Sequence, residues 1–134
     1  MKSTPELKRE AQKVFNAFIR LRDEGKRCIS YNGRNSTMQA GHYFSAGKYN
    51  ILRFNEDNCH LQCVECNCYK EGNLEAYKEN LIKKIGVERF AALELLSETK
   101  VFKDDRTLFL EIIETYNNKI LKHHFGEPDL NQLF

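Results

Sequence analysis

The residues of this 134-residue chain that could carry chemistry lie close together near its middle. They are His42, Asn58, Cys63, Cys66 and Asn67. A Cys-x2-Cys pair that opens a helix can place two thiolates on one metal, but a structural zinc ion needs four ligands. Taken singly, a strand histidine is usually a packing residue, and a loop asparagine usually caps a turn. The order and spacing of the set are more specific than any member.

The cysteines indicate a reducing compartment. The chain has five of them, an odd number, and Cys68 joins Cys63 and Cys66 in one short run. The first residues, MKSTPELKREAQ, contain no apolar segment of the kind that a secretory signal has. We therefore expect a cytoplasmic protein whose thiols stay reduced, so that metal binding or packing explains them better than disulfides do.

Composition and charge favour a globular domain that meets a polyanion. Hydrophobic residues make up 41% and charged residues 30%, which excludes a disordered tail. No apolar run approaches the roughly 20 residues of a membrane-spanning helix. The net charge of +2 hides an asymmetry, because residues 1–53 carry a balance of +7 and residues 54–134 one of −5. A basic half suits nucleic acid, although basic residues on a helix also form an ordinary solvated face.

Helical periodicity surrounds a non-helical centre. It predicts a basic helix over residues 4–25, capped by Thr4, and further helices over 65–69, 74–85, 87–98 and 106–125. In the centre, glycines separate brief apolar stretches, CIS, QAGHYF and YNILRF, which are typical of hairpin strands. The prediction is one α+β domain over residues 1–134, mostly helical, with a hairpin-plus-helix core at about 28–72 and C-terminal helices at 74–125.

These residues resemble the HNH, or ββα-metal, nuclease motif. In that motif a histidine ends the first strand, an asparagine precedes a Cys-x2-Cys pair by five residues, and a histidine or asparagine follows the pair. His42, Asn58, Cys63, Cys66 and Asn67 hold these positions as an HNN variant. One branch is closer still. The runs AQKVFNAFIRLRDEGKRCIS, AGHY, LRFNEDNCHLQC, CN and NLIKKIG resemble the phage NinG (Rap) recombination proteins, over residues 8–95.

The resemblance implies a metal-dependent DNA endonuclease that acts on branched recombination intermediates such as Holliday junctions. His42 would be the general base that takes a proton from the attacking water, and Asn58 would hold the His42 ring in register. Asn67 would offer its amide oxygen to Mg²⁺ or Mn²⁺, whose charge would stabilise the scissile phosphate. Backbone phosphates would be held by basic residues, namely Arg9, Lys13, Arg20, Lys48 and Arg53.

The chain departs from the motif at its structural zinc. The first Cys-x2-Cys pair is reduced to Cys28-Ile-Ser-Tyr31, and a tyrosine cannot replace a thiolate at zinc. One interpretation is that zinc is lost and the cysteines are small core residues. The other is that Cys28, Cys63 and Cys66 bind zinc with a fourth ligand, for which the candidates are Cys68, His60 and Cys59.

A second departure is Gly41, where many HNH enzymes carry an acidic or histidine metal ligand. The catalytic ion would then depend on Asn67 together with Gln39, His60, Asp57 or water. His60 also has a plainer interpretation, because on the loop it could cap the helix or pack on Cys63. We assign no role to His123 and His124, since adjacent histidines at a helix end usually interact with its terminal carbonyl groups.

Three functions are open on the sequence alone. The leading prediction is the nuclease, as a homodimer whose two active sites would cut the two strands of a junction. The alternative is a non-catalytic DNA-binding module on the same ββα and zinc-knuckle scaffold, which Gly41 and Tyr31 favour. The third is a helical interaction protein with the cysteines in its core, and it best explains the acidic C-terminal half.

Overall fold

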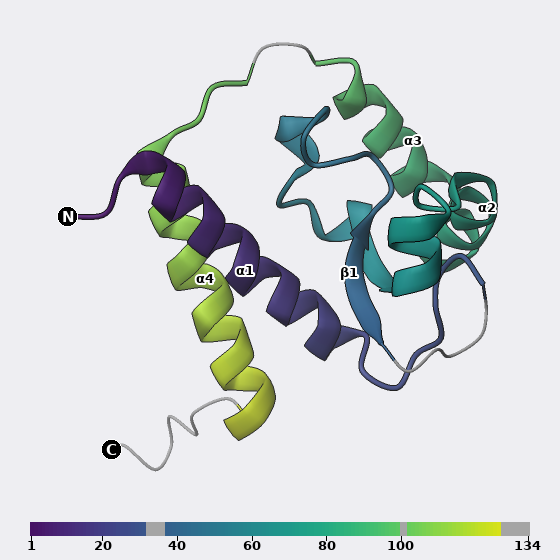
Figure 1. Cartoon of the computed structure of the whole chain (residues 1–134), viewed down its shortest axis with the longest axis horizontal. Helices are drawn as coiled ribbons and strands as arrows, with labels where there is room; N and C mark the ends of the chain where they lie inside the picture. Colours follow the sequence, from purple (N-terminus) through teal and green to yellow (C-terminus); the bar gives the residue numbers. More distant parts are fainter. Residues whose placement is uncertain (32–36, 100–101, 127–134) are drawn as a thin grey trace.

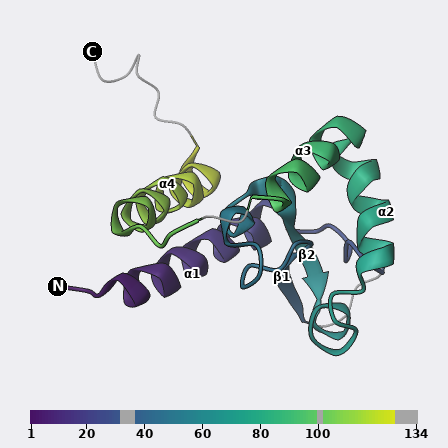
Figure 2. The ribbon, with the colours of Figure 1, turned by 90° about the horizontal axis from the view of Figure 1, so that it is seen from above.

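The computed structural model describes residues 1–31, 37–99 and 102–126 (Figure 1). Its elements are α1 (Thr4–Arg22), β1 (Met38–His42), η1 (Asn50–Leu52), η2 (Glu56–Asn58), β2 (Cys59–Cys63), η3 (Glu65–Tyr69), α2 (Leu74–Ile85), α3 (Val87–Ser97) and α4 (Arg106–Phe125). The two views show α4 alongside α1, with α2 and α3 beyond the hairpin (Figures 1 and 2). A small sheet in a mostly helical chain confirms the α+β prediction. None of the helices in the described ranges has the length and apolarity that a bilayer crossing requires.

The hairpin pairs β1 and β2 antiparallel, with Gly41 opposite His60 and His42 opposite Cys59. Side chains alternate between the two faces of a strand. One face carries His42 and Cys59 and packs on Phe15 of α1. The other face carries Gly41 and His60 and meets α2, so the hairpin lies between two helical layers.

The strands are not all where the sequence predicted them. The segment YNILRF forms η1 and a turn, because short-range bonds such as Leu52 N–H to the Tyr49 carbonyl (2.9 Å) close it locally. The segment CIS is also a turn, although Ile29 N–H donates to the Leu61 carbonyl at 2.9 Å. The second strand is β2, which we did not predict, since all five of its residues are buried and it lacks the alternation of a half-exposed strand.

The helix pair α1 and α4 encloses one part of the core. Ser3, not Thr4, caps α1, and its hydroxyl accepts from the Glu6 N–H at 3.3 Å. The helix ends at Arg22, three residues before the predicted Gly25. Asp105 caps α4, one of the two caps that the sequence predicted. Between the helices pack Leu7, Ala11, Phe15, Ile19, Phe109 and Tyr116.

The helices α2 and α3 enclose the other part of the core with the loop between the strands. Its fully buried members include Leu52, Tyr77 and Leu81. The Tyr77 hydroxyl donates to the Gly41 carbonyl at 2.6 Å. Because Gly41 directly precedes His42, the packing of α2 fixes the end of β1 on which the predicted base stands.

Candidate active site and metal centre

The His42 side chain is held by the backbone of the loop between β1 and β2. Its Nε2 lies 2.9 Å from the carbonyl oxygen of Arg53. A carbonyl can only accept, so Nε2 carries the proton and Nδ1 carries the lone pair. The ring also stacks on Phe15, with 6.3 Å between the ring centroids. The predicted base is therefore held in one orientation, and its basic nitrogen is Nδ1.

The surroundings of His42 favour the uncharged ring. Burial lowers the pKa of His42 below its ordinary value, because the imidazolium would lose its water. Its Nδ1 is 3.9 Å from Cys59 Sγ, and burial raises the pKa of Cys59 so far that this thiol stays protonated. At neutral pH the imidazole is thus in the form that accepts a proton.

Asn58 is fully buried and ties the loop together. Its Oδ1 accepts from the Phe44 N–H at 2.9 Å, and its Nδ2 donates to the carbonyls of Phe44 at 2.9 Å and Leu52 at 3.1 Å. These contacts include no atom of His42. Leu52 directly precedes Arg53, whose carbonyl holds the His42 ring, so Asn58 can position that ring only through the loop.

Asn67 lies in η3, directly after Cys66, and is half-buried. Its Nδ2 donates to Gln39 Oε1 at 2.8 Å, whereas its Oδ1 has no hydrogen bond to a residue that the structure describes. His42 and Asn67 both line a cavity of about 390 Å³, which Lys48 and Glu71 also line. The fold thus brings the predicted base and the predicted oxygen ligand to one cavity.

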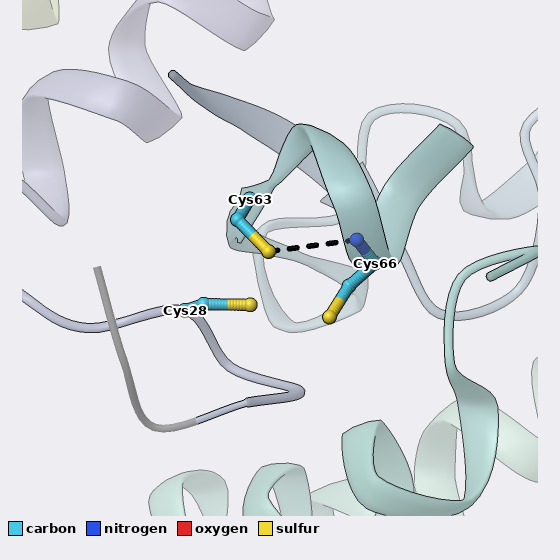
Figure 3. Close-up of side chains that lie close together, drawn as sticks. All are labelled: Cys28, Cys63 and Cys66. Atoms are coloured by element: carbon cyan, nitrogen blue, oxygen red, sulfur yellow. Dashed lines mark hydrogen bonds between the residues drawn. The ribbon is translucent and has the colours of Figure 1, made fainter. Parts of the chain in front are cut away.

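Three cysteines gather at the other end of the hairpin. The sulfur atoms of Cys28, Cys63 and Cys66 all lie within 4.8 Å of one another (Figure 3). Cys28 comes from the turn after α1, and the other two come from the end of β2 and from η3. All three are buried. Three thiols at this spacing suit a soft or borderline ion, so this cluster could bind a metal such as zinc.

Two thiols of this cluster, those of Cys63 and Cys66, differ in how readily they ionise. Burial opposes ionisation of Cys63, but hydrogen bonds from Cys66, including its N–H at 3.5 Å, hold the pKa of Cys63 below its ordinary value. Burial raises the pKa of Cys66 to about 11. Cys63 therefore ionises before Cys66, and a bound cation would be needed to deprotonate Cys66 near neutral pH.

The three candidates for a fourth zinc ligand lie outside the cluster. Cys68 is exposed and its sulfur is 3.5 Å from Gln39 Oε1, while Cys59 lies beside His42. His60 is buried with both ring nitrogens engaged, Nε2 with the Asp57 carbonyl at 2.8 Å and Nδ1 with Lys84 Nζ at 2.8 Å. Tyr31 is 59% exposed. The residues that the structure describes thus bring together three thiols and no fourth protein ligand.

The predicted DNA contacts are of two kinds. Arg9, Lys13 and Arg20 are exposed on α1, and Lys48 is exposed where it lines the cavity. Arg53 is half-buried, and its guanidinium donates inward to Asn50 Oδ1, Gln12 Oε1 and the Ala46 carbonyl. The structure therefore leaves four of the five side chains open to solvent and uses the fifth to tie the loop to α1.

The sequence matches the family model described as "Bacteriophage Lambda NinG protein" over residues 1–124. The chain belongs to the NinG family. Protein NinG of Escherichia phage lambda is 46% identical over 87 residues, which are 64% of this chain and 43% of that protein. The proteins of Enterobacteria phage H19B and Salmonella phage P22 are 45% and 44% identical over the same shares. The chain thus spans less than half the length of these curated relatives. No solved structure matches it.

Two residues near His42, one in the cavity lining and one buried outside that lining, were not singled out from the sequence. Glu71 lines the cavity of His42 and Asn67, and its backbone is left-handed, with φ at 50°. Gln62 lies in β2 and packs against Gly41. Neither Glu71 nor Gln62 belongs to a recognisable motif. Gln62 does follow His60 by two residues, and in a strand this spacing places the side chains of Gln62 and His60 on the same face.

Proposed function

We propose that this NinG-family chain is a metal-dependent DNA endonuclease of the HNH type, which hydrolyses phosphodiester bonds. The observation that carries the proposal is the cavity lined by both His42 and Asn67. The imidazole there is oriented by the Arg53 carbonyl and has its lone pair on Nδ1. A fixed, uncharged base beside an oxygen ligand is what hydrolysis by an activated water requires.

Each residue has a distinct task in this mechanism. His42 Nδ1 takes a proton from the attacking water, while the Arg53 carbonyl keeps Nε2 protonated. Asn67 Oδ1 is the ligand for a divalent cation, Mg²⁺ or Mn²⁺. That cation, when bound, supplies positive charge against the phosphate and its leaving oxygen. Lys48 lines the same cavity and holds a neighbouring phosphate.

The substrate we propose is branched DNA, such as a Holliday junction, in the cytoplasm of the bacterial host. This part rests on the resemblance to the phage recombination proteins, since the cavity alone does not define a DNA structure. Cutting both strands of a junction calls for two active sites, so we propose a homodimer. Light scattering that gave a monomeric mass in the presence of junction DNA would contradict the dimer.

A second candidate is a DNA-binding module without catalysis, with the cysteine cluster as its structural centre. The observation in its favour is Gly41, which provides no side-chain ligand beside His42. Such a module would bind DNA with an affinity that falls as salt rises and is independent of magnesium.

Cleavage of a labelled four-way junction and of its matched linear duplex tests the proposal. We would compare wild type, His42→Ala and His123→Ala in Mg²⁺, Mn²⁺ or EDTA. Loss of a general base lowers the rate by about 100-fold or more, whereas His123 is exposed outside the site and should be neutral. Because the pKa of His42 is lowered, the wild-type rate should begin to fall only at a pH below 6.5.

The outcomes separate the two candidates. Metal-dependent cutting that His42→Ala abolishes and His123→Ala retains supports the nuclease. If His42→Ala cuts as fast as wild type, His42 is not the general base. Binding without cutting in every metal would favour the DNA-binding module.

A further inference from the structure

Gln62 carries an unpaired oxygen in the interior. Among the described residues, Gln62 Oε1 is the one buried side-chain nitrogen or oxygen atom that has no hydrogen-bond partner. Its Nε2 donates to the Gly72 carbonyl at 2.6 Å and to Ser30 Oγ at 2.8 Å. Because the Gly72 carbonyl can only accept, the amide cannot be reversed, and the unpaired oxygen is confined to the other side. A buried acceptor without a partner calls for an explanation.

This oxygen occupies the place that a side chain at position 41 would take. A Cβ added to Gly41 would come within 2.0 Å of Gln62 Oε1 and 2.9 Å of Gln62 Cβ. Any residue larger than glycine would therefore displace the Gln62 side chain. Gln62, which is fully buried, thus places a side-chain oxygen beside Gly41, a position directly before His42 that carries no side chain of its own.

The neighbours of Gln62 connect it to Asn67. Gln39 faces Gln62 across the hairpin, and the Gln39 side chain accepts from Asn67 Nδ2 at 2.8 Å. Residues 39, 41 and 62 share one face of the hairpin. In both Gln62 and Asn67 the amide nitrogen has a partner, and the amide oxygen has none within the described ranges.

We propose that Gln62 Oε1 is a ligand of the divalent cation, together with Asn67 Oδ1. The inference rests on the proposed nuclease function and adds a ligand to that site. Amide oxygens are hard donors that suit Mg²⁺ and Mn²⁺. Two neutral donors do not balance the charge of the ion, so the Glu71 carboxylate, which lines the cavity with Asn67, and a DNA phosphate would supply the negative charge, and cation affinity would rise when DNA binds.

Binding of Mn²⁺ to the full chain, measured by the loss of the free-ion signal in electron paramagnetic resonance, tests the inference. Equimolar zinc is added first so that the thiols are occupied. Gln62→Leu removes the oxygen at similar volume, and we expect Mn²⁺ affinity to fall about tenfold or more. The matched control is Ser30→Ala, which removes a partner of the same amide without touching Oε1. We expect its affinity to stay within about twofold of wild type.

A second variant covers the case in which Gln62→Leu does not fold. Gly41→Asp combined with Gln62→Gly removes every Gln62 side-chain atom that a Cβ at position 41 would meet, and it returns an oxygen to position 41. This double variant should bind Mn²⁺ at least as tightly as wild type, whereas Gln62→Gly alone should not. Weak binding by both would contradict the inference.

Parallel cleavage assays separate this inference from the nuclease. If Gln62→Leu binds Mn²⁺ and cuts DNA like wild type, Gln62 is not a ligand and the nuclease stands. If Gln62→Leu loses Mn²⁺ but wild type never cuts, the ligand assignment stands and the nuclease fails. A wild type that neither binds Mn²⁺ nor cuts overturns both.

Discussion

Asn58 and Asn67 are both amides of the proposed site, but their surroundings differ. Asn58 is fully buried and uses its side chain in three hydrogen bonds to the loop backbone. Asn67 is half-buried, makes one such bond to Gln39, and lines the cavity. The first amide therefore supports the loop, and the second is available to a ligand.

Replacing each asparagine by alanine should separate these two contributions. Asn58→Ala leaves buried carbonyls without donors and should lower the free energy of unfolding by about 3 kcal/mol, with loss of cleavage. Asn67→Ala should cost less than about 1 kcal/mol but still abolish cleavage. Urea denaturation and junction cleavage on the same samples measure both quantities. Equal destabilisation by the two variants would contradict this assignment.

The cysteine cluster has three thiols, and Tyr31 stands at the position where the motif has a fourth cysteine. Tyr31 follows Cys28 at the spacing of a Cys-x2-Cys pair, in a turn where the Tyr31 N–H donates to the Cys28 carbonyl at 3.3 Å. Tyr31→Cys would supply a fourth thiolate, so zinc affinity should rise about tenfold or more. Competition with a chromophoric chelator measures it, and Tyr31→Ser is the control. An unchanged affinity would mean that the fourth ligand comes from elsewhere.

At the scale of elements, a buried charge cluster joins α1, β2 and α2. Asp23, directly after α1, is fully buried and accepts from the Leu61 N–H of β2 at 3.0 Å. Arg22 and Lys84 of α2 donate to the same carboxylate. Although burial alone would raise it, the hydrogen bonds from Arg22 and Leu61 hold the pKa of Asp23 far below its ordinary range.

Asp23→Asn should therefore loosen the contact between the helices and the hairpin. It leaves the half-buried cations of Arg22 and Lys84 beside a neutral group, and loss of one partner of a buried ion pair costs about 3–5 kcal/mol of unfolding free energy. Lys26→Ala is the control, because Lys26 is exposed and lies 3.6 Å from the same carboxylate. We expect that control to change stability by less than about 1 kcal/mol.

The pH dependence of unfolding checks the same cluster. A carboxylate with a depressed pKa stabilises the folded state above its ordinary pKa, and this stability is lost as the pH falls. Wild type should thus lose stability below pH 4 more steeply than Asp23→Asn. Parallel curves for the two proteins would contradict the role of Asp23.

At the scale of the whole molecule, α1 with its basic residues packs directly on the hairpin whose His42 lines the cavity. The layer of α1 and α4 packs on the face of the hairpin that carries His42. The hairpin and its loop place Lys48 in the cavity. DNA held along α1 would therefore be close to the hairpin that carries the proposed base.

Salt dependence of DNA binding tests this arrangement. Replacing Arg9 and Lys13 by alanine would remove two of the proposed phosphate contacts, so the slope of log affinity against log salt should become shallower by about 2. The control replaces Lys78 and Lys83 of α2, which are also exposed. Fluorescence anisotropy over a salt series measures the slopes. Equal changes in both double variants would indicate binding by overall charge.

The sequence by itself determined the features that depend on near neighbours. The bounds of α2 at Leu74–Ile85 and of α4 at Arg106–Phe125 are as predicted, because caps and helical periodicity act within a few residues. The NinG family was also evident from sequence runs such as LRFNEDNCHLQC and NLIKKIG, in which the order and spacing of the residues resemble that family. Spacing survives folding, so it identifies a motif before the fold is known.

Only the tertiary structure decided which distant groups meet. Cys28 joins Cys63 and Cys66, Asp23 becomes buried under Lys84, and Gln62 fills the space beside Gly41. Strand β2 escaped prediction for the same reason, since it is buried by layers that come from both ends of the chain. These contacts depend on how separate segments pack, and no local pattern of residue types encodes that packing.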